Sequence, residues 1–73
     1  MTNLRYWFTT QSPQNRKLFI TNMIYKTGKT RKTIYSYLDN QAPKLIDDEI
    51  VRQTNGELKV NQLYNNVKLI NHE

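Results

Sequence analysis

Apolar residues recur at spacings of three and four in the first half of the chain, which predicts an amphipathic helix. The apolar positions of this first segment are Leu18, Phe19, Ile20, Met23 and Ile24. Ser12 and Pro13 precede it, and these residue types favour the N-cap and the first position of a helix. Gly28 follows it, and glycine readily takes the left-handed conformation that ends many helices. The pattern predicts a helix over residues 12–27.

A second helix is predicted after a gap of only Thr27-Gly28-Lys29. Its apolar positions, again at helical spacing, are Ile34, Tyr37 and Leu38. Thr30 is a suitable N-cap, and the helix must end before Pro43, because the residue before a proline avoids helical angles. The pattern therefore predicts a helix over residues 30–40. Two helices joined by so short a link with a glycine meet at a steep angle.

Outside these helices the pattern indicates strands and a final helix. Residues 1–11, rich in aromatic and β-branched side chains, predict a short strand or an extended arm. Asn55-Gly56 separates two short runs, and this pair is a strong signal for a β-hairpin, predicted over residues 49–60. Asn61 is a suitable cap for a last helix over residues 61–71. The apolar stripe of that helix, which either completes the core or forms a dimer seam, is Val60, Leu63, Val67 and Ile70. The predicted fold class is α+β.

Charge is unevenly distributed along the chain. The first 38 residues contain seven Lys or Arg and no acid, whereas the remainder has six acids and four bases. The two parts carry charges of +7 and −2, so the first part presents a field that attracts a polyanion. The alternative is a solvated basic face without a partner.

The composition argues against several classes of protein. A chain of 73 residues forms one domain with one modest core. It has no cysteine, and its one histidine, His72, is next to the end. No carboxylate pair, metal-ligand cluster or nucleophile–base set is recognisable, and Asp47-Asp48-Glu49 is interpreted as a solvated acidic run. We expect no enzyme activity, no cofactor and no metal, and a soluble, cytoplasmic protein without a membrane span.

The segment from Ile20 to Asp39, ITNMIYKTGKTRKTIYSYLD, resembles the helix-turn-helix of DNA-binding proteins. The string from Gly28 through TRKTIYSYL resembles the recognition helix of MerR-type and excisionase-type winged domains. Their hairpin wing and following helix resemble NGELKVNQLYNNV, so the similarity covers more than half of the chain. The resemblance implies a small winged helix-turn-helix domain that binds double-stranded DNA.

An outward-facing second helix would enter the major groove, where each base pair presents a distinct pattern of donors and acceptors. The expected base contacts are Arg31, Lys32, Tyr35 and Ser36. The expected phosphate contacts lie at the turn (Lys29, Thr30), on the first helix (Arg16, Lys17, Lys26) and on the hairpin, beside the minor groove (Arg52, Asn55, Lys59).

Some of these residues have simpler interpretations. Arg31 and Lys32 are also ordinary exposed helix formers, and Tyr35 can cover a neighbouring side chain. Trp7, with the aromatic residues beside it, is expected in the core rather than on a base-stacking surface. Arg52 and Lys59 can simply protect the edge of a hairpin from pairing with another chain.

The sequence thus predicts a sequence-preferring DNA-binding protein, either a small transcriptional regulator or an excisionase-like architectural factor. Homodimers or cooperative arrays through the last helix are expected, because one such helix rarely gives tight specific binding. Asn, Lys, Ile and Tyr make up 27 of 73 residues, which suggests an A/T-rich genome such as that of a phage or plasmid. The alternative is a small inhibitor that binds a nucleic-acid-handling enzyme of the host. RNA binding is a third possibility, but the expected aromatic platform is not evident.

Overall fold

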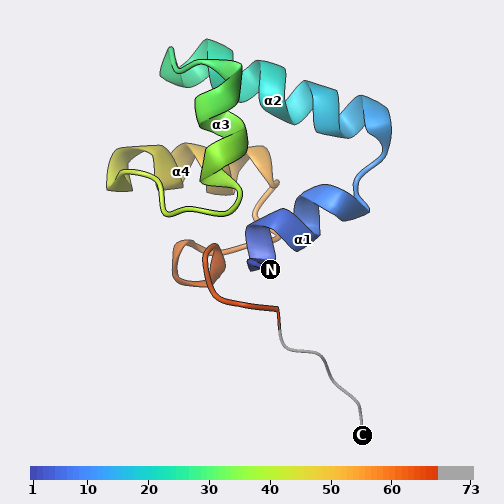
Figure 1. The fold of residues 1–73 in the computed structure, drawn as a ribbon, viewed down its shortest axis with the longest axis vertical. Helices are drawn as coiled ribbons and strands as arrows, with labels where there is room; N and C mark the ends of the chain where they lie inside the picture. Colours follow the sequence, from blue (N-terminus) through green and yellow to red (C-terminus); the bar gives the residue numbers. More distant parts are fainter. Residues whose placement is uncertain (68–73) are drawn as a thin grey trace, which may run out of the picture.

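The computed structural model describes residues 1–67, in which helices are connected by short loops (Figure 1). The elements are α1 (Asn3–Thr10), α2 (Pro13–Thr27), α3 (Arg31–Tyr37), α4 (Lys44–Gln53) and the short 3-10 helix η1 (Val60–Gln62). Figure 1 shows α2 across one end of the molecule, with α3 crossing it and α1 and α4 on the other side of the core. Both α3 and α4 pack against α2.

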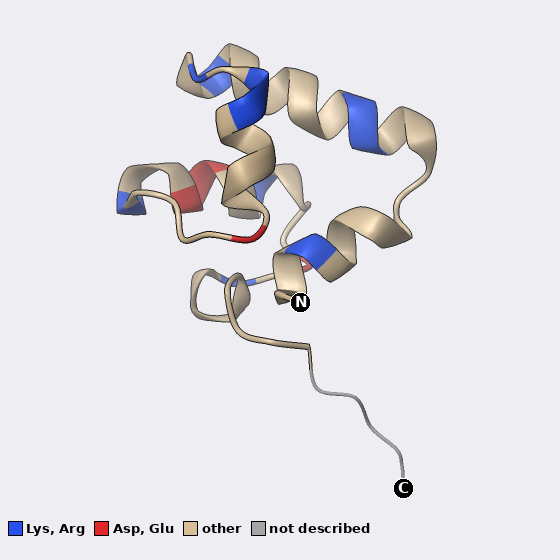
Figure 2. Ribbon diagram, in the orientation of Figure 1, with Lys and Arg blue, Asp and Glu red and all other residues tan. Residues whose placement is uncertain are grey.

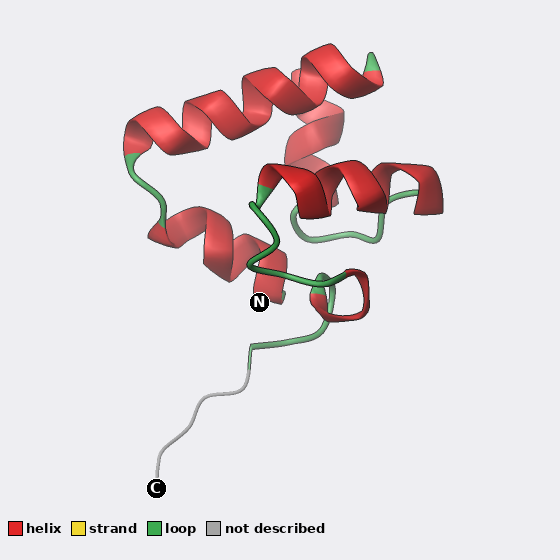
Figure 3. Ribbon diagram, turned by 180° about the vertical axis from the view of Figure 1, so that it is seen from behind, coloured by secondary structure: helices red, strands yellow, loops and turns green. Residues whose placement is uncertain are grey.

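The protein is all-α, and the predicted α+β fold with a hairpin wing is wrong. Residues 1–67 contain no strand, as Figure 3 shows, and their β pairing is limited to an isolated bridge between Thr2 and Asn66. A winged fold requires a paired hairpin, and the segment expected to form one lies in the second half of α4 and the loop after it.

The segment predicted as a strand or arm is instead the helix α1. Leu4, Trp7 and Phe8 lie at helical spacing and are all buried, so one face of α1 packs into the core. The Thr2 hydroxyl caps the helix by accepting a hydrogen bond from the Arg5 amide at 3.0 Å. Spacing and cap together outweigh the β propensity of the aromatic residues, because that propensity depends strongly on context.

The Asn-Gly pair ends a helix instead of turning a hairpin. Asn55 and Gly56 both have positive φ, 57° and 76°. The Gly56 amide donates to the Val51 carbonyl at 3.1 Å, and the Asn55 amide donates to the Arg52 carbonyl at 3.0 Å. These two bonds form a Schellman motif at the end of α4. The same backbone conformation suits both a hairpin turn and a helix C-cap, which explains the wrong prediction.

The predicted last helix is reduced to one short turn in the described residues. η1 spans Val60–Gln62, and Leu63 after it is completely buried. Carbonyls of Leu63 and Asn65 accept hydrogen bonds from the Leu4 and Asn3 amides at 2.9 and 2.8 Å. The segment therefore packs against the start of α1 instead of extending as a helix. Residues 68–71 of the predicted helix, including Ile70, lie outside the described residues.

The two central helices begin at the residues that the sequence indicates. Ser12 caps α2, which ends at Gly28 with a φ of 71°. Thr30 caps α3, whose regular part ends at Tyr37, so the helix is shorter than residues 30–40. The aromatic part of the core joins α1 to α2, because Trp7 meets Phe19 edge-on with ring centroids 5.3 Å apart. Trp7 is thus a core residue, and 8% of it is exposed.

Candidate nucleic-acid interface

The turn between α2 and α3 brings four cations together at one end of the molecule. These residues, all exposed, are Lys26, Lys29, Arg31 and Lys32. Figure 2 shows basic positions on α2 and at the start of α3, with acidic positions on α4 and in the loop after α3. Because residues 13–37 contain no Asp or Glu, no carboxylate on α2, the turn or α3 offsets this charge.

One side of α3 is fixed in the core and the other is exposed. Ile34 and Leu38 are each 1% exposed, and Tyr37 is half-buried. All four predicted base-contacting residues are exposed on the remaining surface of the helix: Arg31, Lys32, Tyr35 and Ser36. The structure thus brings these candidates together on the side of α3 that faces away from the core.

Tyr35, the fourth candidate, also supports α3 from the side. Its ring meets Phe8 of α1 edge-on, with centroids 6.0 Å apart and an interplanar angle of 87°. Tyr35 nevertheless remains 40% exposed. The ring therefore covers a neighbour, and its exposed part lies next to Arg31, one helical turn earlier on the same side.

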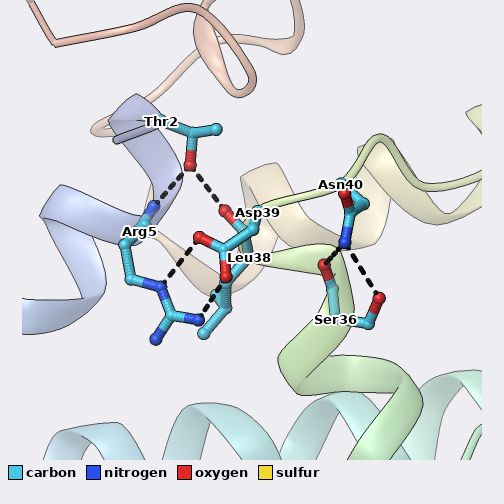
Figure 4. A network of polar contacts seen from close by, with 6 residues as sticks. All are labelled: Thr2, Arg5, Ser36, Leu38, Asp39 and Asn40. Atoms are coloured by element: carbon cyan, nitrogen blue, oxygen red, sulfur yellow. Dashed lines mark hydrogen bonds and ion pairs between the residues drawn. The ribbon is translucent and has the colours of Figure 1, made fainter.

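A network of polar contacts between α1 and the end of α3 was not foreseen from the sequence (Figure 4). The Arg5 guanidinium donates from Nε and an Nη atom to the two Asp39 carboxylate oxygens, at 3.0 and 2.6 Å. The Thr2 hydroxyl donates to the Leu38 carbonyl at 2.5 Å. The hydrogen bonds from Arg5 lower the pKa of Asp39 below its ordinary value. The first acid in the sequence is thus neutralised where α3 ends.

Ser36, in the last turn of α3, is contacted by the loop that follows the helix. The Asn40 side-chain amide donates to the Ser36 carbonyl and hydroxyl oxygens, both at 3.3 Å (Figure 4). The Ser36 hydroxyl hydrogen is still available as a donor, because in these contacts the oxygen accepts.

The predicted phosphate contacts on α2 and the turn differ in their surroundings. Lys17, Lys26 and Lys29 are exposed. Arg16 is half-buried, and its guanidinium donates to the Gln11 carbonyl at 2.6 Å, so it links α1 to α2. The Thr30 hydroxyl accepts from the Thr33 amide at 3.2 Å as the cap of α3. Of these residues, the three lysines leave their charges most accessible.

Arg52, Asn55 and Lys59 do not form a wing, because the described residues contain no hairpin. Arg52 lies on α4 and pairs with Glu49 at 3.0 Å. Asn55 is part of the helix end described above, and Lys59 immediately precedes η1. The expected contact of a wing with the minor groove is therefore wrong. Arg52 instead lines a hollow together with Lys26 and Lys29.

The acidic run is only partly solvated, which corrects the sequence interpretation. Asp48 is exposed, but Asp47 is 4% exposed and accepts a hydrogen bond from the Tyr64 hydroxyl at 2.6 Å. Burial and this hydrogen bond raise the pKa of Tyr64 above its ordinary value. The hydroxyl of Tyr64 also accepts from the Ala42 amide at 3.1 Å, so it joins the loop before α4 to the C-terminal segment.

Comparison of the chain with protein-family models, with curated proteins and with solved structures finds no match. Among residues 1–67, no helix is both long and apolar enough to cross a bilayer, and no three His, Cys, Asp or Glu side chains gather as a metal site would need. The described structure defines a small all-α protein in which α2, a short turn and α3 carry exposed cations at one end.

Proposed function

We propose that the protein binds double-stranded DNA, with the exposed side of α3 in the major groove, as a small sequence-preferring regulator of transcription. The observation that carries the proposal is the acid-free unit of α2, turn and α3, whose cations other than Arg16 are exposed. Phosphates attract such a surface at every sequence, and base preference then depends on the side chains that reach into the groove. No wing is involved in this arrangement.

The dimensions of α3 suit this role. A helix with its side chains is about 10–12 Å across, and the major groove is about 12 Å wide. Its seven residues extend over about 10 Å, which corresponds to about three base pairs at 3.4 Å each. Arg31 and Lys32, in the first turn, are suited to the O6 and N7 acceptors of guanine, and Lys29 before the helix is suited to a phosphate.

Because α3 is so short, we expect more than one copy of the protein to bind at each DNA site. A contact of about three base pairs selects few sequences, and single small modules bury only about 600–1,000 Å² on DNA. We therefore expect neighbouring copies on a repeated or symmetric site. The predicted C-terminal dimer helix does not supply this contact within residues 1–67, where η1 has only three residues.

Binding assays with Arg31→Ala and Lys32→Ala test the proposal. Each variant should lose about 1–3 kcal/mol for the preferred duplex and discriminate less between bases, because a bidentate contact with a base edge is removed. Lys44→Ala is the matched control, since it removes the same charge from an exposed position at the start of α4. Affinity and base preference equal to those of the parent in both α3 variants would refute the assignment of this helix.

A further inference from the structure

A second surface lies where the C-terminal end of α2 faces α4. It is a hollow of about 370 Å³, lined mainly by Lys26, Lys29, Leu45, Ile46, Glu49 and Arg52. Its volume lies within the range of about 300–1,000 Å³ that is usual for binding pockets. It involves α4, which the proposed DNA contact does not use, and it shares Lys26 and Lys29 with the cationic surface at the turn.

The charges around this hollow favour an anionic occupant. Three cations face one carboxylate, and the Glu49 oxygens are already occupied by Arg52 at 3.0 Å and by the Gln53 amide at 2.7 Å. Lys26 and Lys29 form no ion pair with residues 1–67. The Arg52 side chain is 70% exposed, and a guanidinium has five N–H donors. Arg52 can therefore bind a second carboxylate and retain its ion pair with Glu49.

The apolar part of the hollow distinguishes between kinds of anion. Leu45 is 90% exposed, which leaves almost the whole of a large apolar side chain in water beside three cations. Ile46, 8% exposed, lies next to it in the wall. A phosphate group has no apolar part to cover Leu45, whereas a peptide can place an apolar side chain on Leu45 and its carboxylates on the cations.

We propose that the α2–α4 hollow binds an acidic segment of a partner protein, with an apolar side chain of that segment seated on Leu45. This goes beyond DNA binding, because it gives the protein a second surface for a protein partner. Charge complementarity orients the partner and raises the rate of association, and burial of Leu45 adds hydrophobic affinity.

Titration of isotope-labelled protein with the acetylated peptide Glu-Glu-Leu-Leu-Glu-Glu tests this inference by NMR. Amide signals of Lys26, Lys29, Leu45 and Arg52 should shift. Leu45→Ser and Arg52→Ala should each weaken binding about tenfold. The first removes the apolar contact surface, and the second removes the guanidinium donors. Both positions are exposed, so the fold should tolerate the changes, and Lys44→Ala should bind as the parent does.

Two further ligands separate the alternatives. Equal binding of the peptide with Gln in place of Glu would show that charge does not matter, and this would overturn the proposal. A mixed-sequence DNA duplex is the second ligand. If the duplex shifts Leu45 and loses affinity in Leu45→Ser, the hollow belongs to the nucleic-acid surface and the peptide proposal is wrong. Absence of any shift with the acidic peptide would also overturn it, whatever the outcome of DNA binding.

Discussion

At the scale of single residues, polar side chains hold both neighbouring and distant parts of the chain together. Ser12 and Thr30 cap amides three residues ahead, so the sequence alone contains the interaction. Asp47 and Tyr64 are 17 residues apart, and their hydrogen bond exists only because the C-terminal segment folds back over α4. No periodicity or cap signal marks such a pair, so the sequence alone predicts a solvated Asp47.

The Asp47–Tyr64 contact should contribute to stability. Tyr64→Phe removes the donor to a buried carboxylate and the acceptor of the Ala42 amide. Unsatisfied buried groups cost about 1–3 kcal/mol, so the free energy of unfolding in urea should fall by that amount. Tyr25→Phe removes a hydroxyl from a side chain that is 83% exposed and is the control. Equal losses in the two variants would contradict the structural role of the contact.

The Arg5–Asp39 pair predicts a dependence of stability on pH. The pKa of Asp39 is lowered in the folded protein, so its contribution is complete above the unfolded pKa of about 3.9 and is lost as the pH falls through the folded pKa. Asp39→Asn should cost at most about 1 kcal/mol at pH 7, because the pair is exposed, and the difference should vanish in acid. Asp48→Asn should stay within about 0.5 kcal/mol of the parent. A difference at Asp39 that grows in acid would have the wrong sign.

At the scale of elements, helices were predictable where apolar spacing and end signals agreed. α2 has both, and the structure has a helix there with Ser12 and Gly28 at its ends. α4 was missed because Asn55-Gly56 directed the interpretation toward a hairpin, although Ile46 and Ile50 are four residues apart and both buried. A positive φ is shared by hairpin turns and helix ends, so only tertiary packing separates these outcomes.

The turn before α3 gives a prediction for Gly28. Its φ is 71°, and nothing lies within 4 Å of an added Cβ, so a substitution there meets backbone strain without steric conflict. Gly28→Ala should lower the free energy of unfolding by about 1–2 kcal/mol, and Gly28→Asn should lower it by less, because asparagine tolerates the left-handed region. Urea unfolding of the two variants measures the difference. An alanine variant as stable as the parent would show that this left-handed cap is not required.

At the scale of the whole molecule, the division of charge was visible in the sequence, but the packing of the chain ends was not. The basic first half forms α1, α2 and α3, and the acids begin at Asp39. The amides that open α1 are satisfied by carbonyls some 60 residues later, and this closes the fold without a sheet. These hydrogen bonds between the two ends of the chain form only when the core is assembled, so the sequence pattern does not predict them. Arg52, which the sequence places on a wing, lies on α4 and lines the hollow beside Lys26 and Lys29.

The role of α3 in the major groove can be tested by an NMR titration of isotope-labelled protein with the duplex that it selects from a random pool. The largest amide shifts should cluster in residues 29–36, the turn and α3, and they should disappear in the double variant Arg31→Ala and Lys32→Ala. If the largest shifts lie on α4 or the C-terminal segment and α3 is unaffected, the proposed position of α3 in the groove is contradicted.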